Sequence, residues 1–125
     1  MDSKEKALKT AEFLHDKKAQ DIKILELKEL TIITDYFVIC SAESTTQVKA
    51  LAEYLQETMQ QEGYKLYGIE GFSHAHWVLM DYGDVIVHIF LEETRRYYDL
   101  ERLWLDAPRI QIEKITSDKS RAVYR

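Results

Sequence analysis

The sequence predicts an α/β or α+β domain whose mixed sheet of about five strands is covered by helices. Three observations support this fold class. The 125 residues are 46% hydrophobic, which is enough for one domain with a single core. Helical and strand patterns follow in the order helix, strand, strand, helix, strand, hairpin, helix. The hairpin carries an almost wholly apolar face, which must lie against the core.

Two segments have the apolar spacing of amphipathic helices. Residues 3–18 place alanines and leucines on one stripe, and an Asp-Ser pair at the start is available as a cap. The second helix starts after Ser44, whose spacing to Gln47 fits a capping box, and it stops at Gly63. Its apolar stripe comprises Val48, Leu51, Ala52, Leu55 and Met59.

Three further segments have strand patterns. Residues 21–27 alternate imperfectly, which predicts a strand with one solvent-facing or edge side. Residues 35–41 are more apolar and predict a central strand that is buried on both faces. Residues 64–68 predict a short strand, and residues 69–73, which include a second glycine, predict a loop.

Residues 76–104 carry the most specific pattern in the chain, a β-hairpin followed by a helix. Two apolar runs, 77–81 and 84–91, flank Tyr82 and Gly83, and a glycine in the second place suits a turn that needs a positive φ. This two-residue loop predicts three opposed pairs: Asp81 with Asp84, Leu79 with Ile86, and Trp77 with His88.

The predicted hairpin has two unlike faces, because neighbouring residues of a strand point to opposite sides. The apolar face comprises His76, Val78, Met80, Val85, Val87, Ile89 and Leu91. The mixed face comprises Trp77, Leu79, Asp81, Asp84, Ile86, His88 and Phe90. We expect the mixed face either to be covered by a helix or to be offered to a partner.

A last helix and a basic extension follow the hairpin. The helix is predicted by an i, i+3, i+4 triplet and is capped by Asp99 or Thr94, and the triplet comprises Leu100, Leu103 and Trp104. We expect the two leucines to belong to the core. Pro108 ends the helix, so we divide the chain into a domain, 1–107, and an extension, 108–125, that pairs as a strand through Ile110 and Ile112.

Charge is distributed unevenly along the chain. Residues 109–125 contain five basic and two acidic side chains, a net +3, so of the total of −5 residues 1–108 carry −8. Residues 70–106 alone contain eight acids against three arginines. Such a body repels bare nucleic acid and favours a basic protein surface. The chain has no apolar run of membrane-spanning length and no signal or transit pattern, so we expect a cytoplasmic protein without membrane contact.

Three blocks of sequence resemble one known family in order and spacing. These are TDYFVIC (34–40), DYGDVIVHIF (81–90) and RRYYDLERLWLDA (95–107), and they are similar to the ribosomal silencing factors, also called Iojap-like or RsfS proteins. The resemblance implies a small α/β domain with a nucleotidyltransferase-like sheet that lacks the active site. It also implies a non-enzymatic protein that binds the large ribosomal subunit at its fourteenth ribosomal protein, blocks joining of the small subunit and lowers translation when nutrients are limiting.

Carried over by position, the resemblance places partner contacts in the hairpin and in the segment after it. We expect Trp77 to be an anchor, although it fits a core position equally well, and Asp81 and Asp84 to pair with basic partner residues. The predicted partner-binding residues are His76, Trp77, Asp81, Tyr82, Asp84, Arg95, Tyr97, Tyr98 and Glu101. The basic extension is a candidate for contact with ribosomal RNA. The family pattern often has glycine where this chain has Ala42, which puts any special backbone conformation there in doubt.

Other functions stay open as alternatives. A nucleotide-binding or nucleotidyltransferase-like protein would use Asp81 and Asp84 for a divalent ion, but the chain lacks a phosphate-binding glycine loop. His74, His76 and His88 have no ligand spacing, so we predict no metal, no cofactor and no catalytic residue. The one cysteine, in an apolar run, is expected to be a buried hydrophobe. A homodimer through an exposed hairpin face is a further alternative.

Overall fold

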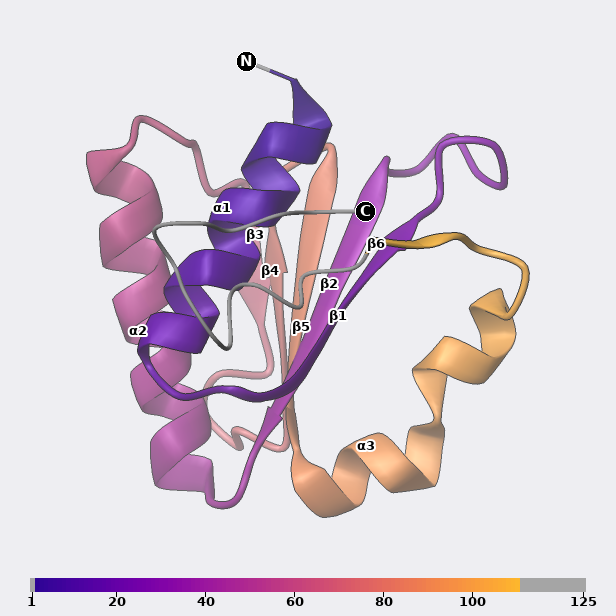
Figure 1. Ribbon diagram of the computed structural model, residues 1–125. Coiled ribbons are helices and arrows are strands. Elements are labelled where there is room, and N and C mark those ends of the chain that lie inside the picture. The colour runs from indigo at the N-terminus through magenta and orange to yellow at the C-terminus, as the bar shows by residue number, and fades with distance from the viewer. Residues whose placement is uncertain (1, 111–125) are drawn as a thin grey trace.

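The computed structural model describes residues 2–110 as a six-stranded sheet with helices on both faces (Figure 1). Strands and helices together follow the predicted α+β class. The elements are α1 (Ser3–Asp16), β1 (Gln20–Glu26), β2 (Tyr36–Ala42), α2 (Thr45–Gln61), β3 (Gly68–Glu70), β4 (Trp77–Asp81), β5 (Val85–Leu91), α3 (Glu92–Tyr98), the 3₁₀ helix η1 (Leu100–Trp104) and β6 (Arg109–Ile110).

The strand order is β3-β4-β5-β2-β1-β6, with β2 and β5 parallel and all other neighbours antiparallel. β2 is central and largely buried, as the sequence predicts. The sixth strand is β6, which covers part of the outer edge of β1 by pairing Ile110 with Ile24, as the prediction of a strand in the extension implies. The predicted continuation of that strand through Ile112 lies outside the described residues.

The first face of the sheet is covered by α1 and α2, which carry the predicted apolar stripes into the main core. Both helices have capped starts. The Asp2 carboxylate accepts the backbone N–H of Glu5 at 2.7 Å, and the Ser44 hydroxyl accepts that of Gln47 at 3.1 Å. The return contact of the predicted capping box is displaced by one residue, because the Gln47 side chain accepts the N–H of Glu43.

The second face is covered by α3 and η1, where the sequence predicted one helix. Asp99 adopts a left-handed conformation, φ +48°, which ends the hydrogen-bond ladder of α3 and starts a tighter 3₁₀ turn. Neither predicted cap therefore operates as proposed. On this face Leu100 and Trp104 pack against a second cluster of buried residues, which comprises Leu25, Leu27, Ile39, Phe90 and Ala107. Leu103 is 76% exposed, so the assignment of Leu103 to the core was wrong.

The hairpin register differs from the prediction by two residues. Tyr82 donates its N–H to the carbonyl of Val85, so the loop is Gly83 with Asp84, and Asp81 lies opposite Ile86. Trp77 pairs with Phe90, and the predicted facing of the two aspartates was wrong. Gly83 supplies the positive φ, +87°, at the first loop position instead of the second. A shift of two residues preserves the strand period, so the predicted faces are confirmed for the residues within β4 and β5. Two residues outside these strands depart from the prediction: Asp84 pairs with Lys6 of α1, and His76 is exposed.

The edge strand β3 also lies later than predicted. It comprises Gly68–Glu70 instead of residues 64–68, and only the N–H of Tyr67, bonded to the carbonyl of Asp81, extends its pairing backward. Directly after β3 the chain turns at Gly71, which has φ +81° and lies against the backbone carbonyl of Trp77. A Cβ at Gly71 would overlap that carbonyl, so the approach of the turn to β4 requires glycine.

Alanine substitutions at two glycines test this close approach. Gly71→Ala and Gly63→Ala both place alanine at a positive φ, but Gly63 has nothing within 4 Å of the added Cβ. We expect Gly71→Ala to lower the free energy of unfolding by about 1–3 kcal/mol more than Gly63→Ala does, measured by urea denaturation. Equal losses would mean that the turn moves away from Trp77 without penalty.

Candidate functional site

The structure separates the predicted partner-binding residues into three groups. Trp77 and Asp81 are the first and last residues of β4, so they lie about 13 Å apart along the strand. The first group, at the start of β4, comprises His76, Trp77, Tyr97 and Tyr98. The second group, around the hairpin turn, comprises Asp81, Tyr82 and Asp84. The third group is the ion pair of Arg95 with Glu101.

Three residues of the first group, His76, Trp77 and Tyr98, line an open groove. Trp77 is partly buried, stacks on Phe90 with a centroid distance of 4.8 Å, and lies 5.1 Å from the Tyr98 ring. Tyr97 packs edge-on against Tyr98, and these tyrosines are 81% and 55% exposed. The groove, which we call the aromatic groove, is lined by Gly71, His74, His76, Trp77, Thr94 and Tyr98. Its volume of about 300 Å³ suits protruding side chains of a partner.

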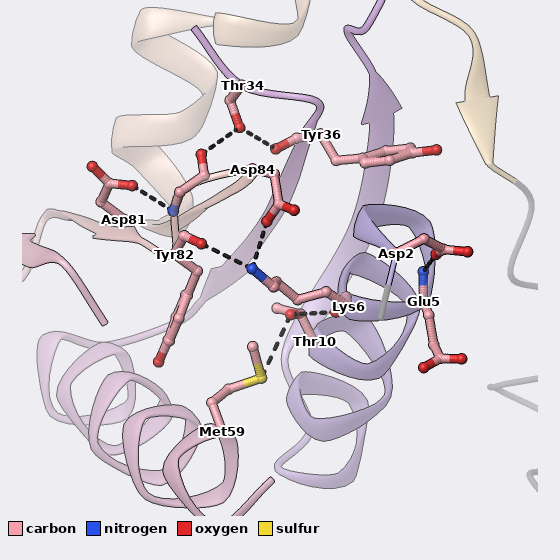
Figure 2. Close-up of polar contacts among 11 residues, drawn as sticks. Asp2, Glu5, Lys6, Thr10, Thr34, Tyr36, Met59, Asp81, Tyr82 and Asp84 are labelled. Atoms are coloured by element: carbon pink, nitrogen blue, oxygen red, sulfur yellow. Dashed lines mark hydrogen bonds and ion pairs between the residues drawn. The ribbon is translucent and has the colours of Figure 1, made fainter. Parts of the chain in front are cut away.

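The second group is tied to α1 (Figure 2). The Lys6 ammonium lies 2.5 Å from the Asp84 carboxylate and donates to the carbonyl of Tyr82 at 3.0 Å. Asp81 accepts the N–H of Gly83 at 2.8 Å, which stabilises the turn. The Tyr82 ring is buried in the main core, and burial raises the pKa of its hydroxyl to about 12. Tyr82 therefore presents no side chain to a partner, and the charge of Asp84 is already paired.

The third group joins α3 and η1, which cover the second face of the sheet, to the strands beneath them. The Arg95 guanidinium is buried and makes two 3.1 Å hydrogen bonds to the Glu101 carboxylate. It also donates to the carbonyl of Asp21 at 2.7 Å and to the Ser41 hydroxyl at 3.1 Å. One side chain thus connects α3, η1, β1 and β2. The sequence analysis placed Arg95 among the partner contacts. In the structure its N–H groups donate to residues of the same domain, so Arg95 acts as a tether between these elements.

The histidines, the cysteine and the carboxylates of the described residues were the candidates for a metal or redox site. No group of three or more His, Cys, Asp or Glu side chains among residues 2–110 is arranged to hold a metal ion. His88 is buried behind Trp77 and does not line the groove that His74 and His76 line. Cys40 is buried, as predicted, and desolvation raises the pKa of its thiol to about 12. Within the described residues, no helix is long and apolar enough to cross a bilayer.

Sequence reasoning missed several members of the aromatic groove. His74, Thr94 and Gly71 reach it because β5 passes into α3 without a connecting loop and because the Gly71 turn folds back against Trp77. No spacing rule joins residues that meet through such a turn. The sequence has no glycine, proline, asparagine or aspartate near the junction of Leu91 and Glu92. This absence of turn residues was the one available signal that α3 starts directly at the end of β5.

The fold and the groove define a small mixed-sheet domain with an aromatic surface site. A crystal structure of a protein from Chromobacterium violaceum has the same fold, with a TM-score of 0.81 and 38% identity, covering 83% of this chain and 87% of that one. The "Ribosomal silencing factor RsfS" of Halalkalibacterium halodurans is 43% identical over 102 residues, which are 82% of this chain and 87% of the relative.

A family model described as "Ribosomal silencing factor during starvation" matches residues 1–124. The chain therefore belongs to the ribosomal silencing factor (RsfS) family. A more distant relative is the mouse "Mitochondrial assembly of ribosomal large subunit protein 1", which is 34% identical over 94 residues. That match covers 73% of this chain and 41% of the mouse protein.

Two neighbouring arginines test the tether. Arg95→Leu leaves Glu101 without its partner, whereas Arg96→Leu removes only an exposed pair with Glu92. We expect Arg95→Leu to lower the free energy of unfolding by about 2–3 kcal/mol and Arg96→Leu to lower it by less than about 0.5 kcal/mol. Chemical denaturation of both variants measures the difference. A loss of similar size in both would exclude a special role for Arg95.

Proposed function

We propose that this protein binds the large ribosomal subunit at its fourteenth ribosomal protein, on the face that meets the small subunit. By occupying that face it excludes the small subunit and represses translation on cytoplasmic ribosomes under nutrient limitation. The observation that carries the proposal is the aromatic groove, in which the exposed Tyr98 lies beside the partly buried Trp77 on an acidic domain. The family description, which names silencing during starvation, supports the biological setting.

The groove has the composition of a binding hot spot. Trp and Tyr provide a large contact area with few rotatable bonds, so little conformational entropy is lost when a partner docks. The rings of Tyr97 and Tyr98 face water in the free protein, so a partner can bury them. The Trp77 ring stacks on Phe90, which supports it from inside the domain. A partner side chain inserted beside Trp77 would be enclosed by aromatic faces, which attract guanidinium and ammonium groups.

Charge favours a basic partner. Residues 70–106 contain eight acids and three arginines, and two of these arginines are paired with Glu92 and Glu101. Asp84 is paired with Lys6 of α1. The other acids give this part of the surface a negative potential, which attracts basic ribosomal proteins and raises the rate of encounter. The name of the mouse relative, which refers to assembly of the large ribosomal subunit, supports the choice of subunit.

Steric exclusion needs no catalysis. A folded domain seated on the joining face prevents contact between the subunits as long as it stays bound, so residence time determines the strength of repression. The positively charged residues 109–125 remain a predicted contact to ribosomal RNA, because phosphate attracts lysine and arginine without sequence preference.

A subunit-joining experiment tests the proposal. Purified protein is mixed with isolated large subunits, small subunits and magnesium are added, and the complexes are separated on a sucrose gradient. We expect the protein to migrate with large subunits and the joined peak to shrink as its concentration rises. Protein that stays at the top of the gradient, with joining unaffected, would contradict the proposal. Sedimentation of the free protein in the same buffer tests the alternative of a homodimer.

A matched pair of tyrosines tests the location of the contact. Tyr98 and Tyr67 are 55% and 64% exposed, but Tyr67 lies beside the edge strand β3, away from the aromatic groove. We expect Tyr98→Ala to weaken large-subunit binding about tenfold or more and Tyr67→Ala to leave it unchanged within about twofold. Both variants should remain folded, because neither tyrosine is buried. Affinity that falls only for Tyr67→Ala would move the contact to the other end of the domain.

A further inference from the structure

A buried histidine contacts the proposed anchor of the groove. His88 lies in the middle of β5, is 3% exposed, and accepts a hydrogen bond at Nδ1 from the indole Nε1–H of Trp77 at 3.0 Å. Its ring lies 4.5 Å from the Phe37 ring, edge-on, and 6.2 Å from the Phe90 ring. The imidazole is therefore enclosed by aromatic side chains on the second face of the sheet.

The hydrogen bond fixes the protonation of this imidazole. An indole N–H only donates, so Nδ1 must present a lone pair, and the proton of a neutral ring resides on Nε2. Desolvation lowers the pKa of His88 to about 4, so the ring is neutral at pH 7. Nε2 is buried and has no hydrogen-bond partner among residues 2–110. Its N–H is thus a buried donor that no side chain or backbone group among these residues satisfies.

Stability alone does not account for a histidine at this position. Its partners across the sheet, Leu79 on β4 and Ile39 on β2, are aliphatic, and an aliphatic residue here would bury no unpaired donor. What an aliphatic residue cannot supply is an acceptor for the Trp77 indole. Without that acceptor the indole loses its inward hydrogen bond and gains freedom to rotate at its side-chain torsions.

We propose that His88 is a positioning residue: it holds the Trp77 indole in the orientation that forms the aromatic groove beside Tyr98. In this orientation the indole N–H points inward, the ring stacks on Phe90 at an interplanar angle of 30°, and the Tyr98 ring lies 5.1 Å away. The role in partner binding rests on the proposed function, whereas the orientation of the indole is a property of the free protein.

Two substitutions separate positioning from stability. His88→Leu removes the acceptor together with the unpaired donor. His88→Asn keeps an acceptor, because the amide oxygen occupies the place of Nδ1, but it keeps unpaired N–H groups as well. We therefore expect His88→Leu to unfold at the same temperature as the original protein or higher, and His88→Asn to unfold at a lower one. Binding to the large subunit should follow the opposite order, with about a tenfold loss for His88→Leu and less than about threefold for His88→Asn.

Proton–nitrogen NMR of the free protein reports the orientation directly. The chain has two tryptophans, so Trp104 provides an internal reference for the indole N–H signal of Trp77. In His88→Leu the Trp77 signal should move toward the position of an indole without a hydrogen bond, exchange faster with water, and lose its proton contacts to the Tyr98 ring. In His88→Asn the signal and the ring contacts should be retained.

Each result decides one of the two claims. An unchanged Trp77 signal in His88→Leu would overturn the positioning role whatever happens to binding. Full binding by a variant whose signal has moved would overturn the importance of this orientation for partner binding. If the original protein does not bind large subunits at all, the proposed function fails. The NMR comparison then still determines whether His88 orients Trp77.

Discussion

The fold depends on covering the second face of the sheet with very little chain. Both faces of β2 and β5 are buried, but only the seven-residue α3 and the five-residue η1 follow to cover that side. Helices this short are not stable by themselves in water. The buried Arg95 guanidinium compensates by joining them to β1 and β2 through Glu101, Asp21 and Ser41. The attachment holds α3, which carries Thr94 and Tyr98 at the aromatic groove.

The two ends of the hairpin differ in how much of their surface is free to bind a partner. At the turn, Lys6 binds Asp84 and the Tyr82 carbonyl, so charge and backbone are satisfied inside the domain. At the opposite end, β5 passes directly into α3, and the tyrosines at the end of α3 remain exposed beside Trp77. The turn end thus maintains the fold, and the α3 end has surface available for binding. A sequence motif that includes both ends does not reveal this division.

Patterns with a fixed period were predictable from the sequence, and contacts made across the fold were not. The faces of the hairpin were correct although its register was wrong, because a shift of two residues returns each side chain to the same side. The split of the last helix was missed, because the apolar spacing of Leu100, Leu103 and Trp104 carries no sign that Asp99 adopts a left-handed conformation. Tyr82 and Arg95 were predicted to be surface residues, because nothing near them in the sequence indicates that they are buried. Tyr82 is buried in the main core, to which α2 contributes, and Arg95 is buried against β1 and β2.

Two buried polar atoms in the described part of the chain have no hydrogen-bond partner, the Tyr82 hydroxyl and His88 Nε2, and magnitudes distinguish them. Burying an aromatic ring of about 150 Å² stabilises by about 4 kcal/mol, which exceeds the roughly 1–3 kcal/mol of an unpaired hydroxyl. Packing therefore explains Tyr82. An imidazole is smaller and more polar, so the same comparison leaves His88 close to balance or unfavourable. The histidine is then best explained by its second nitrogen, which receives the indole N–H of Trp77 beside the aromatic groove.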